Sequence, residues 1–382
     1  MIDPIQLLRD MIAIPSVNPM RANCGEAVER GMANFIENAL ARAGIDCERQ
    51  TVVEGRDNVI GIVYGNQHQH PSNGLMLNSH MDTVPVANMQ INPFDPIMKD
   101  GCIFGRGSCD AKASLAAMLA ATVHYANQSV RPNDMVFAAM ADEEFSFSGS
   151  WKLIEKQWPV SACVVGEPTC LQRVIAHKGI VRWRIVVNGK SAHGATPDRG
   201  RNAIYDAARL VLVLKDFADE LGASRPHHLL NHATLNVGRV VGGQSINIVP
   251  DRCVIEVEMR LLPGEEASHV LEVCCNFVRE RVDEELQFTF EAPYLIDPAM
   301  ETSSDARIVT AVGEAREREI GEAGDLTGAN YGTDGSKLSR AGIRTVVCGP
   351  GNIAQAHTDN EFVEIDQVRL ATRTYSRLLS NW

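Results

Sequence analysis

Short apolar runs alternate with helical stretches in the first part of the chain, and several runs end in acidic or imidazole residues. The runs lie near residues 58–64, 75–78, 135–140 and 163–165, and a helical stretch at 112–124 falls between them. This alternation predicts an α/β sheet with helices on both faces. Ligands of open α/β sheets bind beyond the carboxyl ends of the strands, so the residues after each run are the first candidates for a site.

Further helices are predicted before and after this region. Asp3 followed by Pro4 is typical of a helix start, and a helix from about Glu26 to Ala43 is ended by Gly44. Near the C-terminus the sequence predicts a helix at 306–316, a strand at 344–348 and a last helix from Asp366.

The pattern changes after His177. Alternating strands are predicted at 180–187, 234–241, 253–261 and 286–290, with helices at 202–221 and 265–281. The order βαββαβ indicates a ferredoxin-like domain. At about 150 residues per domain, 382 residues also favour two domains. We therefore expect a discontinuous domain, 1–177 and 293–382, interrupted by an inserted domain at 178–292.

Charge and composition exclude several classes of protein. The net charge of −12 argues against nucleic acid or an anionic membrane as the main partner. The segment MIDPIQLLRD is charged where a signal peptide needs an apolar core, and the best uncharged run for a membrane span, 113–130, is broken by polar residues. The ten cysteines form no C-x-x-C pair, so we expect free thiols and a cytoplasmic protein.

The first run of interest ends in His80-Met81-Asp82. In an extended chain, His80 and Asp82 point to the same side. A metal-bound imidazole usually donates its other N–H to a carboxylate, which is the role that Asp82 would fill. The alternative is a solvated pair in a loop.

Asp110 follows the glycine-rich turn GRGSC, directly before a predicted helix. It could cap that helix, or it could present its two oxygens to two metals. The turn lacks the third glycine of a dinucleotide-binding fingerprint.

Other acids and an imidazole lie beyond later strands. The run 135–140 is followed by Asp142, Glu143 and Glu144, where one acid can bind a metal while its neighbour acts as a general base. Glu167 follows the run at 163–165, and His357 lies near the C-terminus. With a hydroxide, three carboxylates balance the charge of two Zn²⁺, and paired metals activate water for hydrolysis.

These segments resemble those of the di-zinc aminoacylase/carboxypeptidase family. The matching motifs span nearly the whole chain: SHMDTVP (79–85), GRGSCDAK (105–112), ADEE (141–144), GEPT (166–169), GKSAHGATPDRGRNAI (189–204) and QAHTDNEFV (355–363).

The resemblance implies one metal held by His80 and Glu167 and another by Glu144 and His357, with Asp110 bridging. It implies that Glu143 is the general base and that Asp82 orients a ligand.

The resemblance also implies that the inserted domain is a lid and dimerisation domain of a homodimer. In it, His193 would polarise the scissile carbonyl, in the partner's active site. Asn247 and Arg260 match lid positions that contact substrate in relatives. Each has an alternative, because Asn247 could bond only a loop backbone and Arg260 could be an ordinary surface residue.

Within the family, the stretches 232–253 and 349–363 are most similar to acetylornithine deacetylases, which implies release of acetate from N²-acetyl-L-ornithine in arginine biosynthesis. Zn²⁺ is the implied metal, with Co²⁺ as its substitute. The nearest alternative is a succinyl-diaminopimelate desuccinylase or another N-acyl-amino-acid amidohydrolase or dipeptidase. A non-catalytic homologue would lack a ligand or the base, and a serine hydrolase would need a G-x-S-x-G motif, which the sequence lacks.

Overall fold

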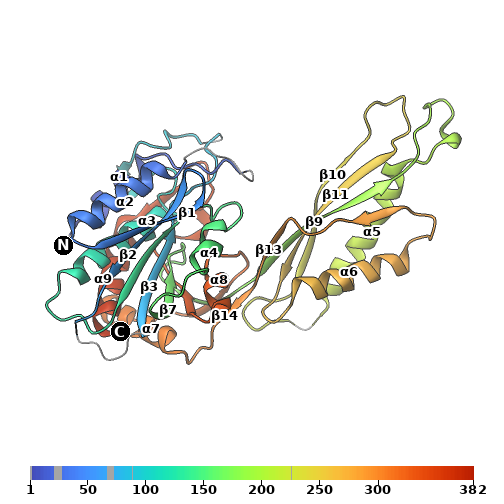
Figure 1. Cartoon of the computed structure of the whole chain (residues 1–382). Coiled ribbons are helices and arrows are strands. Elements are labelled where there is room, and N and C mark those ends of the chain that lie inside the picture. The colour runs from blue at the N-terminus through green and yellow to red at the C-terminus, as the bar shows by residue number, and fades with distance from the viewer. Residues whose placement is uncertain (1, 21–27, 67–72, 88, 225) are drawn as a thin grey trace. The chain divides into compact units, whose positions relative to one another are not determined.

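The computed structural model describes residues 2–20, 28–66, 73–87, 89–224 and 226–382. The chain forms two compact units (Figure 1). The first unit contains residues 1–175, 301–327 and 333–382, and the second contains 176–300 and 328–332. The short return at 328–332 was not expected from the sequence. One contact that joins it to the second unit is the hydrogen bond from the backbone N–H of Lys178 to the carbonyl of Ala329, at 3.1 Å.

A mixed sheet forms the centre of the first unit. Its strand order is β1 (Asp46–Val53), β2 (Arg56–Val63), β6 (Met135–Met140), β3 (Gly74–His80), β7 (Val160–Val165), β16 (Arg344–Val347), β8 (Arg173–His177) and β14 (Met300–Glu301), with β15 (Leu326–Ala329) beside β8. Strands β6, β3, β7 and β16 are parallel, so their carboxyl ends meet at one edge of the sheet. A small separate sheet contains β17 (Phe362–Glu364), β5 (Cys102–Phe104) and β4 (Ile97–Lys99).

The helices of the first unit are α1 (Pro4–Ile12), α2 (Arg30–Arg42), α3 (Lys112–Ala126), α4 (Ser148–Leu153), α7 (Arg307–Ile320), α8 (Gly335–Arg340) and α9 (Ile365–Asn381), with a 3₁₀ turn at Ile353–Gln355. As predicted, Asp3 begins α1, and its carboxylate accepts the N–H of Ile5 at 3.0 Å. Residues 26 and 27 of the predicted second helix lie outside the described residues.

Helix α3 is buried on nearly all sides. The helix packs between the sheet and helices α1 and α9, and small and apolar residues on all its sides allow this close packing. The helix therefore gives the turn at Asp110, directly before it, a rigid base. The mixed α/β sheet with flanking helices confirms the predicted fold class.

The second unit has an antiparallel sheet in the order β10 (Thr234–Gly242), β11 (Arg252–Leu261), β9 (Gly179–Asn188) and β12 (Phe288–Phe290), with β13 (Leu295–Asp297) also paired to β9. Its helices are α5 (Ala203–Gly222) and α6 (Ala267–Arg281), and a 3₁₀ turn covers Pro197–Arg199. The order of strands and helices is the predicted βαββαβ arrangement.

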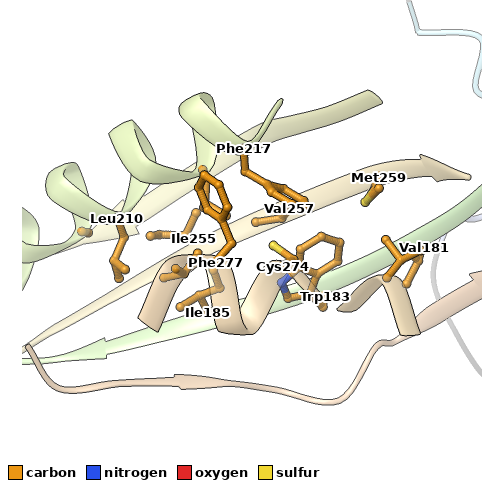
Figure 2. Close-up of a cluster of buried hydrophobic side chains, with 14 of the residues drawn as sticks. Val181, Trp183, Ile185, Leu210, Phe217, Ile255, Val257, Met259, Cys274 and Phe277 are labelled. Carbon is orange, nitrogen blue, oxygen red and sulfur yellow. The ribbon is translucent and has the colours of Figure 1, made fainter. Parts of the chain in front are cut away.

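The core of the second unit follows the alternation of β9. Val181, Trp183 and Ile185 are fully buried, and the rings of Phe217 and Phe277 lie 5.0 Å apart above the sheet (Figure 2). Burying a side chain of this size stabilises a fold by about 1.5–3 kcal/mol.

The alternate residues of β9 lie on the other face of its sheet. There Arg182 pairs with Glu258 at 2.6 Å, and Arg184 pairs with Glu256 at 3.1 Å, each directly across from its partner on β11. These cross-strand pairs support the register of the two strands.

The nine cysteines among the described residues are free, and Cys24 lies outside them. Within the described part of the chain, no helix has the length and apolar character that a membrane crossing needs.

Candidate metal centre

Three neighbouring parallel strands present the predicted acids and imidazole at one edge. His80 is the last residue of β3 and is paired with Met140, the last residue of β6. Glu143 and Glu144 therefore follow β6 directly beside His80. Glu167 follows β7, the neighbour of β3 on its other side. The expected placement beyond the carboxyl ends of the strands is found.

Asp110 lies at the end of the turn that leads into α3. The turn is held by Glu361, which is fully buried and was not singled out from the sequence. Its carboxylate accepts the backbone N–H groups of Gly107, Cys109 and Asp110 at 3.0, 2.8 and 2.9 Å. The only sequence feature that could have pointed to Glu361 was its position within the matched QAHTDNEFV segment.

The structure brings the five predicted ligands together as two groups that share Asp110. In the first group, Nε2 of His80 lies 3.1 Å from Oδ1 of Asp110 and 3.9 Å from Oε2 of Glu167. In the second, Nε2 of His357 lies 3.3 Å from Oδ2 of Asp110 and 3.2 Å from Oε2 of Glu144. Within each group all ligand atoms lie within 4.8 Å of one another.

Burial shapes the electrostatics of this site. It raises the pKa of the carboxyl groups of Glu144 and Glu167. Burial opposes the ionisation of Asp110 as well, but hydrogen bonds with His357 and His80 outweigh it and lower the pKa of Asp110. The concentration of buried acids means that a bound cation would be strongly favoured here.

The donor set fits a pair of divalent metal ions. One oxygen each of Glu144 and Glu167, Oε1, is buried and has no hydrogen-bond partner among the described residues. Such oxygens need a cation or a donor, and imidazole nitrogens with carboxylate oxygens are the ligands that Zn²⁺ takes in proteins. The role of the five residues as metal ligands stays a prediction.

Glu143 differs from Glu144 although the two are adjacent. It belongs to neither ligand group, and its side chain is buried. Burial, together with the nearby acids Glu167 and Glu144, raises the pKa of its carboxyl group well above the usual value.

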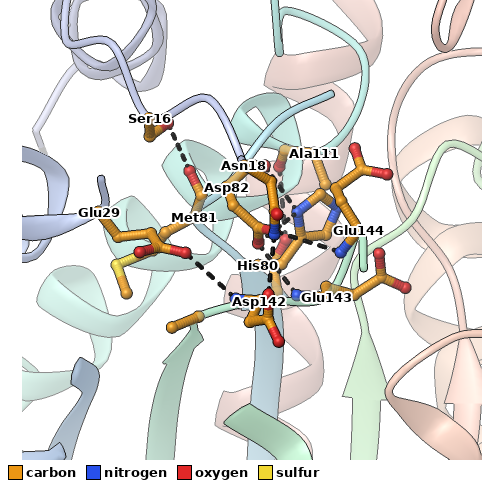
Figure 3. Close-up of polar contacts among 12 residues, drawn as sticks. Ser16, Asn18, Glu29, His80, Met81, Asp82, Ala111, Asp142, Glu143 and Glu144 are labelled. Atoms are coloured by element: carbon orange, nitrogen blue, oxygen red, sulfur yellow. Dashed lines mark hydrogen bonds and ion pairs between the residues drawn. The ribbon is translucent and has the colours of Figure 1, made fainter. Parts of the chain in front are cut away.

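Asp82 contacts His80, although chiefly through its backbone. Nδ1 of His80 lies 2.9 Å from the Asp82 carbonyl oxygen and 3.6 Å from the carboxylate. The carboxylate instead accepts the backbone N–H groups of Glu143 and Glu144 at 3.1 and 3.2 Å (Figure 3). It also accepts a hydrogen bond from Asn18, which the sequence did not point to.

The remaining three candidates lie in the second unit. His193 and Asn247 are exposed and lie on adjacent segments, since the N–H of Gly194 donates to the Asn247 carbonyl at 2.8 Å. Arg260 is half-buried on β11 and lines a cavity of about 500 Å³ together with Lys178. The roles of these three residues stay predictions.

Known proteins resemble this chain over almost its full length. Residues 76–381 match the family model of Peptidase family M20/M25/M40. Acetylornithine deacetylase from Myxococcus xanthus is 29% identical over 365 residues, 92% of each chain. Acetylornithine deacetylase from Proteus mirabilis is 28% identical over 388 residues, 99% of this chain and 96% of the relative.

Solved structures share the fold. Aminopeptidase PepT from Bacillus cereus has a TM-score of 0.77 at 20% identity, covering 99% of this chain and 97% of that one. A Bacillus subtilis protein described as a dinuclear metal-binding peptidase from the M20 family has a TM-score of 0.71 at 18% identity, with the same coverage.

Proposed function

The chain belongs to the peptidase family M20/M25/M40, and on that basis we propose that it is a two-metal amide hydrolase that deacetylates N²-acetyl-L-ornithine. The products are ornithine and acetate, in arginine biosynthesis. The observation that carries the proposal is the pair of ligand groups joined by Asp110, next to the buried Glu143. The choice of substrate is supported by two relatives named acetylornithine deacetylase, which align over 92% and 99% of this chain.

We assign one metal ion to His80, Asp110 and Glu167, and a second to Asp110, Glu144 and His357. Zn²⁺ is the proposed ion and Co²⁺ a substitute, because imidazole and carboxylate ligands suit both. When bound, such ions act as Lewis acids that polarise a carbonyl group and make water more acidic.

Glu143 is the proposed general base. Its carboxylate takes a proton from the attacking water as the oxygen of that water bonds to the acetyl carbon. The C–N bond then breaks, and Glu143 returns the proton to the leaving nitrogen, so that acetate and a free amine are released. The hydrogen bond from the backbone N–H of Glu143 to Asp82 supports this role, because it fixes the backbone position from which the Glu143 side chain extends.

His193 is the proposed donor to the substrate carbonyl oxygen. Its Nδ1 accepts the N–H of Ala195 at 3.1 Å, which in a neutral imidazole leaves the proton on Nε2, available for donation. We propose that this donor comes from the partner subunit of a homodimer joined through the second unit. Exposed apolar residues of that unit, including Tyr205 and Ile246, support such an interface.

Two other residues of the second unit are proposed to contact substrate. Arg260 and Lys178 place two cations at one cavity, which suits the carboxylate of an N-acyl amino acid. Asn247 offers an exposed amide near His193. The free thiols of the described cysteines support a reducing compartment, the cytoplasm.

The alternative is the same chemistry on another acyl group, as in a succinyl-diaminopimelate desuccinylase, another N-acyl-amino-acid amidohydrolase or a dipeptidase. The metal ligands would not change. Steady-state rates on acetylornithine, succinyl-diaminopimelate, several N-acyl amino acids and dipeptides, with Zn²⁺ or Co²⁺ supplied, separate the candidates. We expect the highest kcat/KM on acetylornithine, and a clear preference for any other member of the panel would overturn the assignment.

A further inference from the structure

Asn18 lies between two carboxylates from different strand-end loops. Its Nδ2 donates to Oδ2 of Asp82 at 2.7 Å and to Oδ1 of Asp142 at 2.9 Å (Figure 3). The amide is held in this orientation because its Oδ1 accepts the backbone N–H of Met20 at 2.9 Å. Asn18 is fully buried, so both hydrogens of Nδ2 are committed to carboxylates.

The two carboxylates hold the segment that carries Glu143 and Glu144. Asp82 accepts the backbone N–H groups of both, as described above. Asp142 directly precedes them and has a φ of 62°, a left-handed conformation that residues with side chains rarely adopt. Asn18 contacts both carboxylates and therefore connects the loop after β3 with the loop after β6.

The surrounding charges make this bridge costly to replace. Arg56 pairs with Glu29 and donates to Asp142 at 2.9 Å, and all three side chains are buried. The Asp82 carboxylate accepts hydrogen bonds from the Asn18 amide and from two backbone N–H groups, with the His80 imidazole 3.6 Å away. An amide supplies donors to Asp82 and Asp142 without adding a charge. Loss of these donors would remove one hydrogen bond from each buried carboxylate, leaving Oδ2 of Asp82 with only the Glu144 N–H and Oδ1 of Asp142 with only Arg56.

We propose that Asn18 is a positioning residue that, by bridging Asp82 and Asp142, fixes Glu143 and Glu144 relative to His80. The inference rests on the proposed function, in which Glu143 is the base and Glu144 a metal ligand. Because Asn18 acts through the segment at 142–144, its loss changes turnover and the metal environment more than substrate affinity.

The test compares Asn18→Ala with Ser16→Ala as a matched control. Ser16 is equally buried on the same segment and donates to the Met81 carbonyl at 2.7 Å, but it contacts neither carboxylate. Asn18→Ala should lower kcat by about 10–100-fold, the usual scale for residues that orient metal ligands, with little change in KM. The visible absorption spectrum of its Co²⁺-loaded form should also differ from that of the unsubstituted protein. Ser16→Ala should lose thermal stability but keep kcat and the Co²⁺ spectrum.

A second variant, Asn18→Asp, separates hydrogen-bond donation from space filling. Aspartate has almost the same shape, but it replaces the donors with a negative charge beside two carboxylates. If donation matters, Asn18→Asp is more damaging than Asn18→Ala; if only volume matters, it is milder. A milder Asn18→Asp, or a Ser16→Ala with an equal loss of kcat, overturns the inference.

Failure of the proposed function remains distinguishable from failure of this inference. Rates are first measured on whichever substrate of the panel the unsubstituted protein hydrolyses fastest. If it hydrolyses none, the proposed function is wrong. The Co²⁺ content and the Co²⁺ spectrum of the three variants then still test the positioning role of Asn18. An unchanged spectrum in Asn18→Ala overturns that role, and a change confined to the Asn18 variants supports it.

Discussion

Oε1 of Glu361 accepts the backbone N–H of Asp110 at 2.9 Å, although the two residues are 251 positions apart in the chain. The other oxygen of Glu361 bonds Arg106 at 2.7 Å and the N–H of Gly107 at 3.0 Å. A buried carboxylate with these partners fixes the turn that presents Asp110 to both ligand groups.

Substitution Glu361→Gln should therefore destabilise the protein and weaken metal binding. An amide NH₂ would face Arg106 and the N–H of Gly107, and breaking a buried charge pair in this way costs about 3–5 kcal/mol. Denaturant unfolding and metal analysis check both effects. Glu364→Gln, an exposed position nearby, is the control and should change stability by less than about 0.5 kcal/mol. Equal stability of the two variants would contradict this role of Glu361.

Activity should depend on two divalent ions. The three carboxylates and two imidazoles of the site motivate this expectation. Dialysis against a chelator should abolish hydrolysis and lower Tm, because ligands that bind only the folded state stabilise it. Zn²⁺ or Co²⁺ should restore both properties. Full activity in protein shown to be metal-free would disprove the mechanism.

Glu143 and Glu144 should respond differently to the same substitution. Glu143→Ala should keep both metals and lose turnover by at least ~10²-fold, the scale for loss of a general base. Glu144→Ala should lose a metal, because Glu144 belongs to the second ligand group. Metal analysis beside kinetics checks this, and an equal fall in metal content in both variants would show that the assignment is wrong.

His193 should act across the subunit boundary. His193→Ala should bind metals and dimerise normally, yet lose turnover by roughly 10²–10³-fold, as expected for loss of a donor to the developing oxyanion. Mixing it with Glu143→Ala protein under subunit exchange should restore activity, because one composite site of the mixed dimer is intact. His269→Ala, an exposed histidine on α6, is the control and should retain activity. Mixed dimers without recovered activity would exclude action in trans.

All ten cysteines should be reduced thiols. The nine in the described residues are free, and burial raises the pKa of the thiols of Cys274 and Cys348 to about 12, which slows their reaction in the folded protein. Titration of the denatured, unreduced protein should find close to ten thiols. A count of about two would argue for an oxidising compartment.

Strands with a strong local pattern were predictable from the sequence. Strand β6 has the predicted bounds because Met135–Met140 is an unbroken buried run, and β9 shows the alternation expected of a half-buried strand. Strand β1, Asp46–Val53, was missed because it is an edge strand whose residues are all at least partly exposed, so no apolar pattern marks it.

The residues that complete the site were harder to find, for a different physical reason. The predicted ligands follow apolar runs and carry a recognisable side chain. Asn18 and Glu361 instead act through contacts with residues 64 and 251 positions away, respectively, and no local pattern records such contacts. The contact of His80 with the Asp82 carbonyl, closer than that with the carboxylate, likewise depends on backbone geometry that spacing does not reveal.

The interrupted first unit sets an order of events during synthesis. Asp110, Glu144 and Glu167 leave the ribosome before the second unit, whereas His357 follows it. At ~5–20 residues per second, tens of seconds separate Glu167 from His357. During that interval the second unit, apart from residues 328–332, can already fold. The acids of the first unit are then present, but His357 has not yet been synthesised. A nascent chain can therefore complete this candidate metal centre only after the second unit and His357 have both been synthesised.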